Sequence, residues 1–142
     1  SCNTVVPRNY TFSNGSMITG LRSRGYYVAP SVDDANRNSL YLIDFVRGTE
    51  PEEIAENVDK MVVNYGVDTN SDGVANRFLK AADVNDWSQV IAIEVELLFK
   101  AQDSNVTINP QTYFIDGELE TASYRNLYRS YKTFIALRNK AS

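Results

Sequence analysis

The sequence predicts an α+β fold: a single domain over residues 1–142, rich in antiparallel strands, with one short helix. Three observations lead to this prediction. Aromatic residues, which favour strands, make up 11% of the chain. Several segments alternate between apolar and polar residues, which is the period of a half-buried strand. One segment, after position 49, combines a helix-start signal with apolar residues at helical spacing.

The first strands are expected after a polar N-terminal stretch. Residues 1–20 are rich in Asn, Ser and Gly, so that we expect a loop with one short strand around Tyr10. Residues 25–30 and 39–44 are two β-prone runs. The polar segment between them, residues 31–38, suits a hairpin with an extended loop.

A short amphipathic helix is predicted next. Thr49 and Glu52 form a capping box, and Pro51 lies in the first turn, where its missing N–H costs nothing. Apolar residues follow at helical spacing: Ile54, Ala55, Val58 and Met61. From Met61 the period changes to two, which predicts a strand over residues 61–67 that leads into an oxygen-rich loop.

The clearest strand pattern covers residues 90–99. One face is apolar and is expected to be buried: Ile91, Ile93, Val95, Leu97 and Phe99. The other face is expected to be largely solvated: Ala92, Glu94, Glu96 and Leu98. Trp87, just before this strand, is expected in the core.

The last third of the chain predicts a hairpin and a final strand. Residues 111–115 are β-prone, and Asp116 with Gly117 forms a turn signal. Four residues are spaced for a helical turn: Tyr124, Leu127, Tyr128 and Tyr131. Residues 131–137 alternate instead, as in a C-terminal strand.

Composition argues against several functional classes. The chain has no His, which removes the Ser-His-Asp triad and the commonest zinc ligand, and we expect no enzyme. Glu94 and Glu96 would lie about 7 Å apart along their strand, a spacing compatible with an inverting glycosidase, but two solvated carboxylates are the favoured interpretation. A net charge of −4 with scattered basic residues predicts no nucleic-acid partner.

The start of the chain indicates a body cut from a longer protein. It begins at Ser1 without Met or a leader segment, and no stretch reaches the ~20 apolar residues of a membrane span. The single cysteine, Cys2, cannot close an intrachain disulfide. It is either a free thiol or half of a bridge to a partner upstream.

The oxygen-rich loop has the donor order of an EF-hand calcium site. The donors would be side-chain oxygens and one backbone carbonyl: Asp68, Asn70, Asp72, the Val74 carbonyl and Asn76. Gly73 allows the sharp turn, but Leu79 stands where a bidentate Glu is expected. Two interpretations stay open: a structural calcium ion, and a turn whose Asn and Asp side chains bond their own backbone.

Aromatic and basic residues mix over residues 124–134, which is a composition typical of protein interfaces. Tyr124 and Tyr128 lie beside arginines and outside the strand alternation, so they are the best interface candidates. The alternative is that the rings pack in the core while the basic residues are solvated.

Three segments together resemble the PilW-type minor pilins of type IV pili, and more distantly the J-type minor pseudopilin of type II secretion. They are residues 26–41, 56–98 and 133–139, and the middle one is the most specific. The family's loop pattern is Asp-x-Asp-x-Asp-Gly-x-x-Asp, whereas this chain has Asn70 and Asn76 at two of the Asp positions.

This resemblance implies a pilin-like body carried on a long hydrophobic N-terminal helix, which is not part of this sequence. The helix would anchor the protein in the inner membrane, facing the periplasm, and later pack inside the extracellular pilus. The implied partners are other minor pilins and the major pilin, in a complex that primes pilus assembly at or near the tip. The alternatives are a calcium-dependent adhesive or ligand-binding module, and a minor pseudopilin of type II secretion.

Overall fold

The computed structural model describes residues 15, 20 and 22–137. Within this part of the chain there are nine strands and three short 3₁₀ helices. The strands are β1 (Arg24–Pro30), β2 (Asn38–Asp44), β3 (Glu52–Glu56), β4 (Val58–Val67), β5 (Arg77–Leu79), β6 (Val90–Lys100), β7 (Thr112–Ile115), β8 (Glu118–Thr121) and β9 (Tyr128–Ala136). The 3₁₀ helices are η1 (Ala81–Asp83), η2 (Trp87–Gln89) and η3 (Ser123–Arg125). None of the described helices is long and apolar enough for a membrane crossing.

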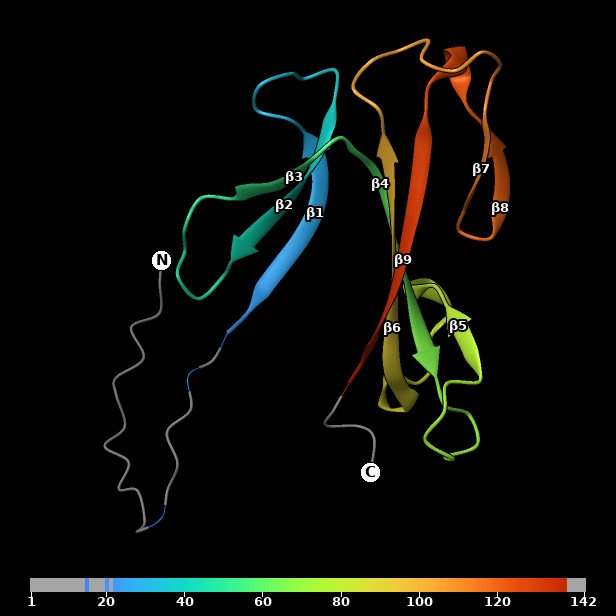
Figure 1. Ribbon diagram of the computed structural model, residues 1–142. Helices are drawn as coiled ribbons and strands as arrows, with labels where there is room; N and C mark the ends of the chain where they lie inside the picture. The colour runs from blue at the N-terminus through green and yellow to red at the C-terminus, as the bar shows by residue number, and fades with distance from the viewer. Residues whose placement is uncertain (1–14, 16–19, 21, 138–142) are drawn as a thin grey trace.

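The strands form three antiparallel sheets (Figure 1). The first has the order β1-β2-β3, the second β5-β4-β6-β9, and the third is the hairpin β7-β8. In Figure 1 the first sheet lies to the left of the four-stranded sheet, and the hairpin lies to its right. The hairpin turn is made by Asp116 and Gly117, both with positive φ (59° and 78°), as a two-residue turn of type I′ requires.

The sequence-based prediction of a strand-rich antiparallel fold is confirmed, but the predicted helix over residues 52–61 is wrong, and the described fold is mostly β. This segment forms β3 and the start of β4, separated by Asn57 in the left-handed region at φ 60°. The helical turn expected around Tyr124 is reduced to η3, and β9 begins at Tyr128. Tyr10 and Cys2 lie outside the described residues.

Hydrogen bonds to one carboxylate explain why β3 is a strand. Glu53 accepts bonds from the Ser31 hydroxyl at 3.0 Å, the Tyr41 hydroxyl at 3.1 Å and the Val32 N–H at 3.2 Å. The Ser39 hydroxyl, although it makes no hydrogen bond of normal geometry within the described residues, and then the Val32 N–H lower the pKa of Glu53 to about 2. Local helix propensity is a weak preference, and these cross-sheet bonds override it.

Two apolar clusters hold the four-stranded sheet. One lies between this sheet and the β7-β8 hairpin: Val62, Leu98, Ile115, Ala122 and Tyr128. The other lies at the opposite end of the sheet, where the segment from η1 to η2 folds back: Val67, Val84 and Val90. Trp87 is not in the core as predicted, since half of its surface is exposed, and its ring packs edge-on against Tyr65.

Candidate functional site

The burial of the two faces of β6 differs from the prediction: the face with the glutamates is the more deeply buried one. Glu94 and Glu96, expected to be solvated, are only 7% and 5% exposed, and Leu98 on the same face is 1% exposed. The hairpin β7-β8 covers this face through Ile115. The apolar face of β6 is only half-buried instead.

Contacts with three partner groups compensate for the burial of these carboxylates. The Lys132 ammonium lies 3.3 Å from Glu94 and 3.8 Å from Glu96. The Asn64 side-chain amide donates to Glu94 at 2.9 Å, and the Asp116 backbone N–H donates to Glu96 at 2.9 Å. Buried carboxylates require such partners. The pair is therefore a structural tie between β4, β6, β9 and the hairpin turn.

The opposite face of the sheet is apolar, and within the described residues its β6 side chains are half-buried while those of β9 are exposed. We call it the open face, and the register of β4, β6 and β9 places these side chains on it: Met61, Val63, Ile93, Val95, Leu97, Phe99, Tyr131, Thr133 and Ile135. Tyr131 and Ile135 are 60% and 50% exposed. A contiguous apolar surface of this kind usually marks a contact site.

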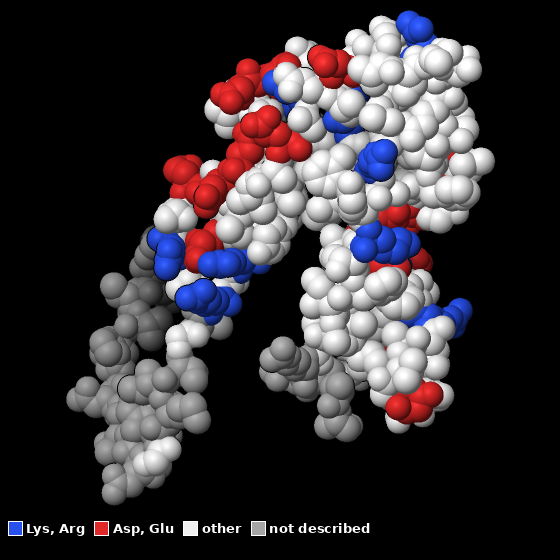
Figure 2. All heavy atoms as spheres, viewed as in Figure 1, with Lys and Arg blue, Asp and Glu red and all other residues white. Residues whose placement is uncertain are grey.

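The open face borders a hollow in the molecule. Figure 2 shows a deep recess between the arm formed by β1, β2 and β3 and the arm formed by the four-stranded sheet. Because the hairpin covers the other face, the open face looks towards this recess (Figure 1). A groove of about 680 Å³ lies at its upper end, lined by Leu97, Phe99, Leu127, Arg129 and Tyr131 among others.

The outer edge of β9 is a second contact surface. Leu137 donates its N–H to Ile91 and Leu127 accepts from Ala101, so the odd-numbered positions of β9 bond to β6. The even-numbered positions point their backbone groups outward. At Tyr128 the Gln111 side chain satisfies them, accepting from the N–H at 2.9 Å and donating to the carbonyl at 3.1 Å.

The Gln111 side chain thus makes the hydrogen bonds that a neighbouring strand would make, but only at Tyr128. Three more positions of β9 present outward N–H and C=O groups with no partner within the described residues: Ser130, Lys132 and Phe134. Ala136 continues this row at the end of the strand. Exposed edges of this length accept strands from other chains.

The loop after β4 is bonded to its own backbone. Both Asp68 oxygens accept N–H groups of the loop, from Ser71 at 2.7 Å and Gly73 at 2.8 Å among others. Burial raises the pKa of Asp68, but the backbone N–H groups, led by Gly73 and Ser71, lower it more, and the net pKa is below its ordinary value. Asn76 accepts from the Thr69 N–H at 2.9 Å.

The loop side chains fit a calcium ion in part. Two carboxylates, two amides and one carbonyl give five donors, against about six to eight oxygens for calcium. The Asn70 amide nitrogen donates to Asp72 at 2.9 Å, so these two side chains are bonded to each other. Nowhere in the described chain do three His, Cys, Asp or Glu side chains gather as a metal cluster. Calcium at residues 68–76 stays a prediction.

The two predicted interface tyrosines lie in different environments. Tyr124 is 80% exposed and has φ 56°, whereas Tyr128 is 7% exposed and stacks on Tyr113 with 4.7 Å between the ring centroids. The Tyr128 ring therefore belongs to the core, and a partner role for Tyr124 stays a prediction. The open face and the β9 edge were not identified from the sequence, although the apolar face of β6 was visible in it.

A family comparison covers most of the chain. The family model described as PilW, Type IV Pilus-assembly protein W, matches residues 25–139. This range contains the open face, the β9 edge and the loop after β4. Comparisons with curated proteins and with solved structures give no significant match.

Proposed function

Since the chain belongs to the PilW family of type IV pilus-assembly proteins, we propose that it is a minor pilin whose body docks in a minor-pilin complex. This complex primes assembly of the pilus, and the protein lies at or near the pilus tip. Before assembly the protein is held at the inner membrane with its body in the periplasm, and afterwards it is part of the extracellular pilus. Its action is docking and not catalysis.

The observation that carries this proposal is the open face. A sheet must bury its apolar face against another layer, and a helix is the usual cover. β6 has 11 residues, so the face is about 35 Å long, enough for six turns of helix. We propose that it receives an apolar helix of the pilus, such as the N-terminal helix that the family resemblance implies.

The β9 edge supports the same proposal from a second side. Its outward backbone groups would pair with an extended strand of another minor pilin or of the major pilin. Such pairing supplies affinity through the backbone, while the side chains next to it select the partner. Helix packing and strand pairing would use different surfaces and so could occur together.

The test is complementation of a deletion strain that otherwise assembles type IV pili. The Val95→Glu variant places a charge on the open face, and Leu119→Glu places the same charge on β8, where Leu119 is already 60% exposed. We expect no pili with Val95→Glu and normal pili with Leu119→Glu. Val95 is half-buried on this face, so thermal melting of the isolated bodies is measured in parallel to verify that Val95→Glu folds. Normal pili in the deletion strain, or with Val95→Glu, would contradict the proposal.

A second candidate is a calcium-dependent adhesive or ligand-binding module. It is supported by the loop at residues 68–76, whose oxygens follow the EF-hand order. This function predicts that attachment is lost in chelator while pili remain normal. The further alternative, a minor pseudopilin, predicts that deletion abolishes type II secretion and leaves piliation unchanged.

A further inference from the structure

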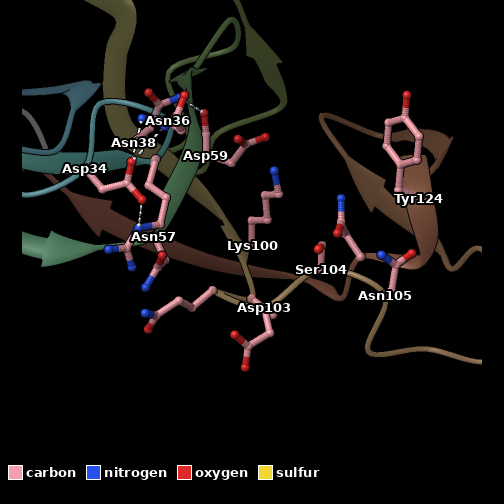
Figure 3. Close-up of a pocket in the computed structure, with 14 residues that line it drawn as sticks. Asp34, Asn36, Asn38, Asn57, Asp59, Lys100, Asp103, Ser104, Asn105 and Tyr124 are labelled. Atoms are coloured by element: carbon pink, nitrogen blue, oxygen red, sulfur yellow. Dashed lines mark hydrogen bonds and ion pairs between the residues drawn. The ribbon is translucent and has the colours of Figure 1, made fainter.

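The segments that line a polar cleft lie at the end of the molecule opposite the start of β1 and the end of β9 (Figure 1), and Figure 3 shows the lining side chains. It is formed by four segments that are distant in the sequence: the β1–β2 loop, the β3–β4 junction, the segment after β6, and η3. Its volume is about 630 Å³, within the usual range of about 300–1,000 Å³ for small-molecule sites. Six of its lining side chains are amides: Asn36, Asn38, Asn57, Gln102, Asn105 and Asn126.

Strained backbone gathers at this cleft. Six non-glycine residues of the described chain have positive φ, and three of them line it: Asn57 at 60°, Asn105 at 58° and Tyr124 at 56°. Arg125, next along the chain, has φ 54°. Such conformations are unfavourable for residues with a Cβ and concentrate at binding sites. Two successive ones in η3 hold the Tyr124 ring outward, 80% exposed.

One wall of the cleft holds a buried acceptor without a partner. Asn126 is 4% exposed, and its Oδ1 has no hydrogen bond within the described residues. A buried polar atom in this state costs free energy. A hydroxyl group suits the lining of this cleft, because it can both donate to and accept from the amide side chains.

The charges of the cleft argue against an anionic ligand. Asp34 is paired with Arg37 at 3.0 Å, so these two neutralise each other. Of the rest of the lining, Asp59 and Asp103 are the remaining carboxylates, and Lys100, at the centre of Figure 3, is the remaining cation. Three carboxylates against two cations leave one negative charge. Phosphates and nucleic acids are disfavoured, whereas an uncharged polar molecule is not.

We propose that this cleft binds a neutral saccharide. The flat, exposed ring of Tyr124 packs against the apolar face of a sugar ring, and the surrounding amides donate to and accept from its hydroxyl groups. The cleft lies at the end of the body away from the start of β1, and it shares Asn57, Lys100 and Ala101 with the groove at the upper end of the open face. This site goes beyond the proposed assembly role, which does not use Tyr124.

Saturation-transfer NMR on the 142-residue chain tests the proposal. Galactose and N-acetylglucosamine are the neutral probes, and glucose 6-phosphate is the anionic probe. We expect transfer to a neutral sugar. Tyr124→Ala should raise the Kd for the sugar, measured by titrating the transfer signal, about tenfold. Tyr131→Ala changes an exposed tyrosine outside the cleft and should leave this Kd unchanged.

Three results would overturn the saccharide proposal. They are no transfer to either neutral sugar, transfer to the phosphate alone, and equal transfer in wild type and Tyr124→Ala. Piliation by the Tyr124→Ala strain is measured in parallel, and it should be normal whichever way the binding result falls, so that the assembly role is tested separately.

Discussion

Replacing Lys132 by Met removes the cation shared by two buried carboxylates. Breaking a fully buried ion pair costs about 3–5 kcal/mol. The Lys132 side chain is 40% exposed, so water screens part of this interaction. Glu94 and Glu96 each keep one hydrogen bond, from Asn64 and Asp116. We therefore expect the free energy of unfolding to fall by about 2 kcal/mol.

Urea unfolding followed by circular dichroism at neutral pH measures this loss. The matched control is Lys60→Met, whose partner Glu120 lies 3.9 Å away with both side chains exposed, and it should change the free energy by less than about 0.5 kcal/mol. Adding Glu94→Gln to Lys132→Met should restore about 1 kcal/mol, because one of the two unpaired charges is removed. If Lys132→Met unfolds like the Lys60→Met control, the two carboxylates are not held as the structure places them.

Three further predictions concern other parts of the molecule. Because the pKa of Glu53 is about 2 against an ordinary 4.5, the stability it contributes is complete above pH 4.5 and is lost as the pH falls to about 2. Glu53→Gln should flatten acid unfolding over that interval, and an unchanged pH profile would refute the assignment. If calcium binds at residues 68–76, excess calcium should raise the melting temperature by about 5 °C relative to chelator. Asp72→Asn should abolish this rise, and identical melting with calcium and with chelator in the wild type would end the calcium hypothesis. Ser130→Pro with Ala136→Pro removes outward N–H groups of β9 and leaves the ladder to β6 intact. We expect this variant to fold but to lose pull-down of other pilins, whereas Ser130→Ala with Ala136→Ser should retain it, and equal recovery by both would exclude strand pairing.

Strands could be predicted from the sequence wherever the pattern was local. The alternation over residues 90–99 and the Asp116-Gly117 turn depend on neighbours in the chain, and both are found in the structure. The helix over residues 52–61 was predicted from equally local signals. It is absent because Glu53 gains hydrogen bonds from residues about 12–22 positions away, which no local pattern contains.

The covered face of β6 could not be predicted for a related reason. From the sequence alone, the carboxylates at positions 94 and 96 are expected to be solvated, because their partners Lys132 and Asn64 are not adjacent in the chain. Lys132 is more than 30 residues away in sequence and reaches the pair only through the pairing of β9 with β6. The polar cleft is similar, since it is assembled from four separate segments and no one of them carries a motif.

The most direct test of the assembly proposal is the accessibility of the open face in intact pili. In a Cys2→Ser background, Val95→Cys and the control Leu119→Cys are labelled with a water-soluble maleimide, in the isolated body and in assembled pili. We expect Val95→Cys to react in the isolated body and to be protected in pili, while Leu119→Cys reacts in both. Equal labelling of Val95→Cys in the two states would contradict the proposal that this face receives a helix of the pilus.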